Sequence, residues 1–166
     1  MASETVFILI GSNVGCRESL LERACALVGE FCGRIIGKSA VYESEPWGFE
    51  AEQWFLNQVI EIETELPPDG LMLELLDIEK DLGRDRTTPH EGYVSRPMDL
   101  DILYYGSQIV DSKYVTAPHP RLHLRRFTLL PLCDIAPDFI HPKMKMSNAK
   151  LLELCNDEGL VKKYEK

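Results

Sequence analysis

Two aspartates that stand two positions apart, Asp99 and Asp101, are the residues best suited to chemistry in this sequence. Residues two apart in a β-strand point to the same face, so the sequence predicts that these carboxylates lie side by side. Adjacent carboxylates repel each other unless a cation offsets their charge. Mg²⁺ prefers oxygen ligands and takes one or two carboxylates together with substrate phosphates. The spacing favours a magnesium site, and the alternative interpretation is a solvated edge strand that carries two acids.

Arginines and histidines gather in the same part of the chain. Six of the nine arginines and three of the four histidines lie between residues 84 and 126. The whole chain has a net charge of −9, but this stretch holds seven Lys and Arg against five Asp and Glu. The forked guanidinium group matches phosphate oxygens, although a single surface arginine is more often an ion-pair partner. Together with the aspartates, the cations predict a polyphosphate–Mg²⁺ site. The arginines are Arg84, Arg86, Arg96, Arg121, Arg125 and Arg126.

A third group of residues is typical of a pocket for a planar heterocycle. Trp47 and Phe55 supply flat apolar surface, and Asn57 offers a paired donor and acceptor to the edge of a ring. Packing of both aromatic rings in the core is the alternative, and without further context it is the commoner outcome.

One apparent nucleotide motif is excluded. Residues 33–39, Gly-Arg-Ile-Ile-Gly-Lys-Ser, resemble a phosphate-binding P-loop, but the spacer is one residue short. A P-loop also leads from a strand into a helix, whereas this segment leads from a predicted helix into a predicted strand. We therefore expect Lys38 to be solvated.

Hydrophobic periodicity predicts the elements that must position these residues. Their order is strand, helix, strand, strand, helix, strand, which predicts an α+β fold with a ferredoxin-like βαββαβ core, an antiparallel sheet, a short hairpin and C-terminal helices. Residues 84–97 form a predicted loop that is longer than most, and long loops are often functional. The predicted strands are 5–10, 34–42, 55–65 and 97–105, and the predicted helices are 17–31, 67–83, 127–135 and 147–155.

Composition sets the class of protein. The 166 residues are 45% hydrophobic and 27% charged, which is typical of a globular protein, and we expect one domain over residues 1–166. The acidic balance argues against nucleic-acid binding. We expect no signal peptide, since the N-terminus carries no basic region, and no apolar run reaches membrane length. The five cysteines are odd in number and form no C-x-x-C pair, so we expect reduced thiols in a cytoplasmic protein. Separately, we expect a monomer.

The residues around the aspartate pair carry a family resemblance. The run Arg96-Pro97-Met98-Asp99-Leu100-Asp101-Ile102-Leu103 resembles the signature of the 6-hydroxymethyl-7,8-dihydropterin pyrophosphokinase family, and similar segments cover nearly the whole chain. The other matching segments are Gly11-Ser12-Asn13, Glu45-Pro46-Trp47-Gly48, Phe55-Leu56-Asn57, Gly83-Arg84-x-Arg86, Pro118-His119-Pro120-Arg121, Arg125-x-Phe127 and Pro131-Leu132.

The resemblance implies a reaction and a set of roles. It implies transfer of pyrophosphate from ATP to the hydroxymethyl oxygen of the pterin, with release of AMP, in folate biosynthesis. Asp99 and Asp101 would hold two Mg²⁺ ions. The implied catalytic residues are Arg84, Arg86 and Arg96, the implied pterin-binding residues are Ser44, Trp47, Phe55, Asn57 and Phe127, and the implied nucleotide-binding residues are Glu79, Arg96, Ile102, His119 and Arg125.

The chain departs from the family's pattern, and two other functions stay open. Tyr93-Val94-Ser95 stands where many members carry Trp-Gly-Pro or a close variant, and Pro120 follows His119 where a tyrosine is common. One alternative is another two-metal nucleotidyl transferase on a ferredoxin-like sheet, which would release pyrophosphate. The other is a non-catalytic ligand-sensing module, because a fold alone fixes no function.

Overall fold

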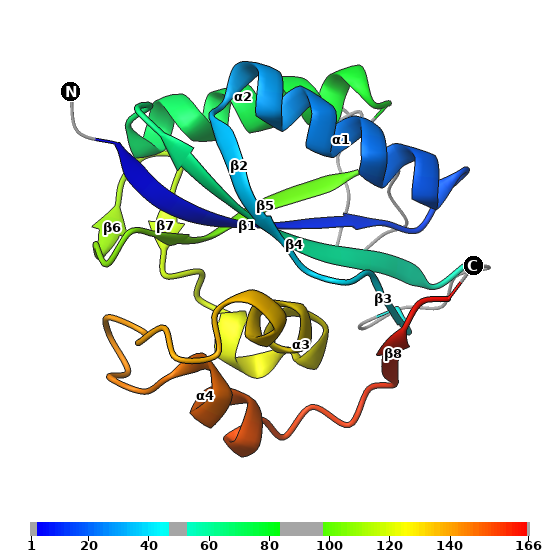
Figure 1. The fold of residues 1–166 in the computed structure, drawn as a ribbon, viewed down its shortest axis with the longest axis vertical. Helices are drawn as coiled ribbons and strands as arrows, with labels where there is room; N and C mark the ends of the chain where they lie inside the picture. Colours follow the sequence, from blue (N-terminus) through cyan, green and yellow to red (C-terminus); the bar gives the residue numbers. More distant parts are fainter. Residues whose placement is uncertain (1–2, 47–52, 84–97, 166) are drawn as a thin grey trace.

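The structure is a computed structural model, and it describes residues 3–46, 53–83 and 98–165. Figure 1 shows a central sheet between two helical layers, with α1 and α2 on one face and α3 and α4 on the other. In chain order the elements are β1 (Glu4–Ser12), α1 (Arg17–Phe31), β2 (Arg34–Lys38), β3 (Tyr42–Ser44), β4 (Phe55–Thr64), α2 (Pro68–Asp81), β5 (Asp99–Tyr105), β6 (Val110–Asp111), β7 (Thr116–Ala117), the 3₁₀ helix η1 (Leu122–Leu124), α3 (Arg126–Ile135), α4 (Asn148–Leu154) and β8 (Val161–Lys163).

The sheet has the predicted antiparallel topology. Its strands follow the order β5-β1-β4-β3-β8, and β2 also pairs with β4. β6 and β7 form the predicted short hairpin. The α+β class and the ferredoxin-like core are confirmed. In the part of the chain that the structure describes, no helix combines the length and apolar character needed to cross a membrane.

The prediction of one strand over 34–42 is wrong. The segment breaks into β2 and β3, and β3 continues to Ser44. The register shifts between Ile35 and Gly37, and the Ser39 hydroxyl then accepts the backbone N–H of Val59 at 2.9 Å. A side chain thus takes a bond that a regular ladder gives to a carbonyl. Strand β8, which pairs with β3, has no counterpart among the predictions.

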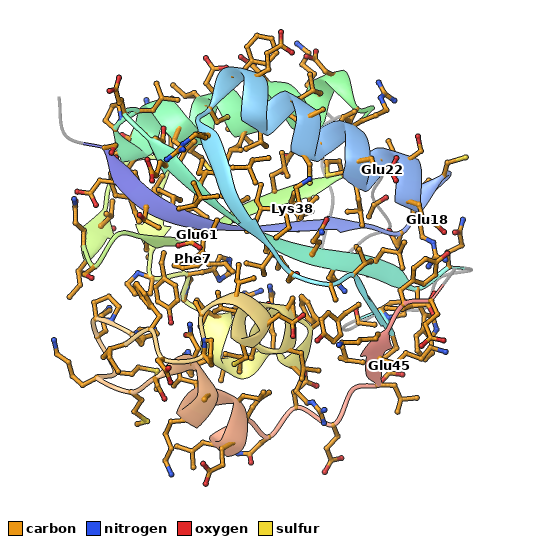
Figure 2. The ribbon with its side chains drawn as sticks, in the orientation of Figure 1. Phe7, Glu18, Glu22, Lys38, Glu45 and Glu61 are labelled. Carbon is orange, nitrogen blue, oxygen red and sulfur yellow. The ribbon has the colours of Figure 1, made fainter. Side chains whose placement is uncertain are left out.

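The segment that resembles a P-loop has the structure predicted for it, a strand that follows a helix. Residues 34–38 are β2, which follows helix α1, and Lys38 is exposed at its end; Figure 2 labels this side chain. All five cysteines are free, as predicted.

Two apolar clusters cover the two faces of the sheet. The face under α1 and α2 buries Met98, Leu100 and Ile102, which confirms the alternation predicted around the aspartates. The opposite face, under α3 and α4, buries Leu9 and Leu103 among others. Because both faces are covered, the central strand β1 is apolar at consecutive positions rather than at alternate ones.

Helix α3 is fixed over one end of the sheet by polar contacts. The Tyr42 hydroxyl of β3 donates to a carboxylate oxygen of Asp134 at 2.9 Å, and the backbone N–H of Ala40 donates to the other oxygen at 3.2 Å. This end of the sheet holds the candidate site.

Candidate active site

A row of paired residues crosses the sheet at the candidate site. Asp99 of β5 pairs with Gly11 of β1, Gly11 pairs with Asn57 of β4, and Asn57 pairs with Tyr42 of β3. Directly opposed residues in antiparallel strands share a face. Tyr42 reaches Asp134 of α3, so the row lies on the α3 face of the sheet. The register therefore places the predicted metal ligand and the predicted pterin-binding amide on one surface.

Gly11 provides space in the middle of this row. A Cβ built on Gly11 would lie 3.3 Å from Oδ1 of Asn57 and 3.8 Å from a ring carbon of Phe55. A side chain here would thus crowd the Asn57 amide and come into ordinary contact with the Phe55 ring. Sequence reasoning cited Gly11 only as part of a turn motif, because its role depends on the strands on either side.

The two aspartates are placed as predicted. Leu100 between them is fully buried, whereas Asp99 and Asp101 are half-buried on the α3 face of the edge strand β5. No group of three or more His, Cys, Asp or Glu side chains suited to a metal ion occurs within 3–46, 53–83 and 98–165. A pair of carboxylates fits Mg²⁺, which takes its remaining ligands from phosphates and water.

His119 lies within electrostatic reach of Asp99. The pKa of His119 is lowered to about 4, chiefly by burial and then by the nearby Arg125 and Arg121, while Asp99 opposes this shift. The backbone N–H of Arg121 donates to Nδ1 of the ring at 3.1 Å. The imidazole is therefore neutral at pH 7, and its proton sits on Nε2. The arrangement places His119 near both Asp99 and Arg125.

Arg125 and Phe127 flank the first residue of α3. The Arg125 side chain is buried, with 7% of the residue exposed, and its guanidinium carbon lies 5.3 Å from the centroid of the Phe127 ring. This distance is within the range of a cation–π contact. A residue predicted to bind phosphates and a residue predicted to stack on the pterin thus touch each other.

Phe127 lines a pocket of about 280 Å³ together with Ser44, Glu45 and Pro46. The rest of the wall comes from Asp157, Gly159, Leu160 and Val161. The volume falls just below the roughly 300–1,000 Å³ typical of drug-sized ligands, so it suits a small ring system. The amide of Asn57 donates to the Ser44 hydroxyl at 2.7 Å, and both residues are buried. Phe55 pairs with Ser44 across β3 and β4. Two of the five predicted pterin-binding residues, Ser44 and Phe127, thus line this pocket, and two more, Phe55 and Asn57, adjoin Ser44.

These observations can be set against known proteins. Residues 7–137 match the family described as 7,8-dihydro-6-hydroxymethylpterin-pyrophosphokinase. The chain belongs to this family. The 2-amino-4-hydroxy-6-hydroxymethyldihydropteridine pyrophosphokinase of Porphyromonas gingivalis is 38% identical over 86% of this chain and 97% of its own length. The Aquifex aeolicus protein of the same name is 40% identical over 83% of this chain and 84% of its own length.

Solved structures confirm the fold of this pyrophosphokinase family member. The Plasmodium falciparum HPPK-DHPS crystallised with pterin and p-hydroxybenzoate superposes with a TM-score of 0.73 at 14% identity, over 92% of this chain. An HPPK-DHPS in complex with substrates gives a TM-score of 0.71 at 15% identity, over 91% of this chain. The chain spans less than half the length of these solved chains, 42% and 43%.

Two predicted nucleotide-binding residues of the pyrophosphokinase lie on the side of the sheet that α1 and α2 cover. Glu79 is 1% exposed, and its carboxylate accepts the backbone N–H of Leu100 at 2.7 Å. Ile102 packs its side chain in the core under α1 and α2, so a contact with ATP would involve its main chain on the edge strand. Four other predicted site residues, Trp47, Arg84, Arg86 and Arg96, lie outside the described residues.

Proposed function

We propose that this pyrophosphokinase transfers the β- and γ-phosphoryl groups of ATP, as one unit, to the hydroxymethyl oxygen of 6-hydroxymethyl-7,8-dihydropterin. The oxygen loses its proton and bonds to the β-phosphorus, the bond between that phosphorus and the α–β bridging oxygen breaks, and AMP leaves. The observation that carries the proposal is the row that places Asp99 and Asn57 on one face of the sheet, with the side-chain-free Gly11 between them.

The pterin would bind in the pocket beside Phe127. Phe55 and Phe127 supply ring faces for stacking, and Trp47 is proposed to complete the wall. The Asn57 amide is oriented by its bond to Ser44, so its position is set before the ligand arrives. A buried amide held in this way selects a heterocycle whose edge presents complementary donors and acceptors, because a ligand without them would leave the amide's remaining polar groups unsatisfied.

Asp99 and Asp101 would hold two Mg²⁺ ions, for which their shared face and partial exposure are suited. When bound, Mg²⁺ neutralises the phosphate oxygens and helps to orient the reacting phosphorus. Arg84, Arg86 and Arg96 are proposed as the catalytic cations that neutralise charge developing on the transferred group; this part of the proposal rests on the sequence alone.

The nucleotide would lie along the β5 edge. His119, neutral at pH 7, can donate its Nε2 proton to a phosphate or sugar oxygen. The Arg125 guanidinium can donate to a phosphate. Glu79 and the main chain of Ile102 are proposed to support the nucleotide. Glu79 also anchors β5, because its carboxylate accepts the backbone N–H of Leu100.

Product analysis tests this proposal. The protein is incubated with ATP, Mg²⁺ and 6-hydroxymethyl-7,8-dihydropterin, and the nucleotides are separated by chromatography. We expect AMP in equal amount to pyrophosphorylated pterin. ADP as the product, or pyrophosphate with a nucleotidylated pterin, would identify a different transferase.

We also propose that the protein is cytoplasmic and monomeric, and that residues 1–166 form one domain.

A further inference from the structure

The C-terminal part of the chain returns to the candidate site. The family match ends at residue 137, yet the pocket beside Phe127 is also lined by Asp157, Gly159, Leu160 and Val161. Figure 1 shows that β8 lies next to β3, so the segment that precedes it runs between α4 and the sheet edge. Part of the pocket wall is therefore built from residues that lie beyond the range matched by the family.

Asp157 binds the start of helix α3. Its Oδ2 accepts the backbone N–H of Arg126, the first residue of that helix, at 3.1 Å. Its Oδ1 accepts the N–H of Gly159 at 2.9 Å. Arg125, at the N-cap position, makes no side-chain capping bond. A carboxylate 31 residues away in sequence thus supplies the cap, and its charge also suits the positive end of the helix.

The segment that carries Asp157 is itself fixed to the opposite side of the pocket. The backbone N–H of Leu160 donates to Oε1 of Glu45 at 3.0 Å, and the N–H of Glu45 donates to the carbonyl of Leu160 at 3.1 Å. Figure 2 shows Glu45 beside β8. Ser44 pairs with Val161 in the adjoining register.

The space within this connection is small. A Cβ on Gly159 would lie 3.1 Å from Oδ1 of Asp157 and 3.3 Å from Oε1 of Glu45. The pocket has β3 and Glu45 on one side and α3 and Phe127 on the other. The closely packed segment from Asp157 to Leu160 therefore joins these two sides through its hydrogen bonds.

We propose that Asp157 is a positioning residue for the pterin: it holds the first turn of α3, and with it the Phe127 ring, at a fixed distance from β3. This inference rests on the proposed function. A cap can also act only on stability, in which case its loss lowers the melting temperature and leaves the two ligands equally affected. A positioning role acts on the ligand that contacts Phe127.

The test compares Asp157→Ala with Glu158→Ala, a matched control that removes the same charge from the adjacent, exposed residue. Pterin affinity is measured by titration in the presence of Mg²⁺ and a non-hydrolysable ATP analogue, and the affinity for that analogue is measured separately. We expect Asp157→Ala to raise the pterin dissociation constant about tenfold, in line with the loss of a helix cap. The dissociation constant of the analogue should change clearly less than that of the pterin, because Arg125 at the start of α3 is only one of several groups proposed to hold the nucleotide, and Glu158→Ala should match the wild type.

Asp157→Asn serves as the conservative variant. Asparagine keeps one acceptor oxygen of two, so its pterin affinity should lie between those of the wild type and Asp157→Ala, and the same comparison decides the question if the alanine variant does not fold. Equal weakening of both ligands, or pterin binding like that of Glu158→Ala, would overturn the positioning role. A wild-type protein that binds no pterin would instead overturn the proposed function.

Discussion

Asp99 and Asp101 show what a residue can contribute when its neighbours fix its direction. Leu100 between them is fully buried, so β5 cannot rotate the carboxylates away from the α3 face without exposing its own core residue. The orientation of each carboxylate is therefore set by the alternation of side chains along β5 and by the pairing of β5 with β1.

Replacing either aspartate tests this at once. We expect Asp99→Ala and Asp101→Ala each to lower kcat/KM by about 10³-fold or more, because each change removes a ligand worth several kcal/mol of charge stabilisation. AMP release at increasing Mg²⁺ concentrations provides the measurement. Asp111→Ala, an exposed acid on the hairpin, is the control. Normal turnover in the two site variants would remove the metal assignment.

Gly11→Ala tests the space in the paired row. The added methyl would lie 3.3 Å from Oδ1 of Asn57, so we expect pterin affinity to fall about tenfold, the effect of modest overpacking. Gly29→Ala in α1 is the control, since its methyl would meet only Ile35, at 3.6 Å. Binding titrations measure both. Equal affinities for the two variants would show that the row does not contact the pterin.

Among the elements, those with a repeating apolar pattern were predictable. Helix α1 spans Arg17–Phe31, the predicted range, because its apolar residues recur every three or four positions. The break between β2 and β3 was not predictable, since it depends on Ser39 reaching the backbone of a strand 20 residues away. β8 has three residues, two of them exposed, and thus no alternation to detect.

The same distinction applies to the site. The period of two in β5 indicated the aspartate pair, whereas the pterin itself could be named only from the family resemblance. Asp157 gave no signal, because its contact with Arg126 exists only once the chain has folded back.

Glu79 connects helix α2 to the strand that carries the aspartates. Glu79→Ala would leave the N–H of Leu100 without this acceptor and open a cavity, so we expect the free energy of unfolding to fall by about 2–4 kcal/mol. Urea denaturation measures this, with Asp77→Ala, an exposed acid on the same helix, as the control. Unchanged stability together with weaker ATP binding would make Glu79 a nucleotide contact and not an anchor for β5.

We expect His141 to make the turn between α3 and α4 sensitive to pH. Its Nδ1 accepts the backbone N–H groups of Lys143 and Met144, at 3.1 and 3.0 Å. Burial lowers the pKa of His141, with His123 and Lys143 adding to the effect. A histidine whose folded-state pKa lies below its unfolded value of about 6.5 binds fewer protons when folded. Stability should therefore fall as the pH drops from neutral through that value, and this loss should level off below the folded-state pKa.

The free energy of unfolding of the wild type and of His141→Asn is measured by urea denaturation from about pH 7.5 to about pH 4, a range that includes the unfolded-state pKa of histidine. Asparagine can accept the same backbone bonds without titrating, so we expect its stability to change less over this range. An identical pH dependence in both proteins would exclude His141 as the cause.

At the scale of the whole molecule, net charge and site charge differ. The chain carries −9 overall, yet its arginines gather in the stretch from residue 84 to 126, which contains the aspartate pair. An acidic chain can therefore serve an anionic substrate, because overall charge governs solubility and long-range encounter more than the interior of a site.

The central claim is the transfer of two phosphoryl groups as one unit, and ATP labelled at the β-phosphorus tests it most directly. With 6-hydroxymethyl-7,8-dihydropterin and Mg²⁺ present, we predict that the label leaves the nucleotide and appears in the pterin, while the released AMP is unlabelled. Label retained in ADP would indicate transfer of a single phosphoryl group, label in free pyrophosphate would indicate nucleotidyl transfer, and either result would contradict the account.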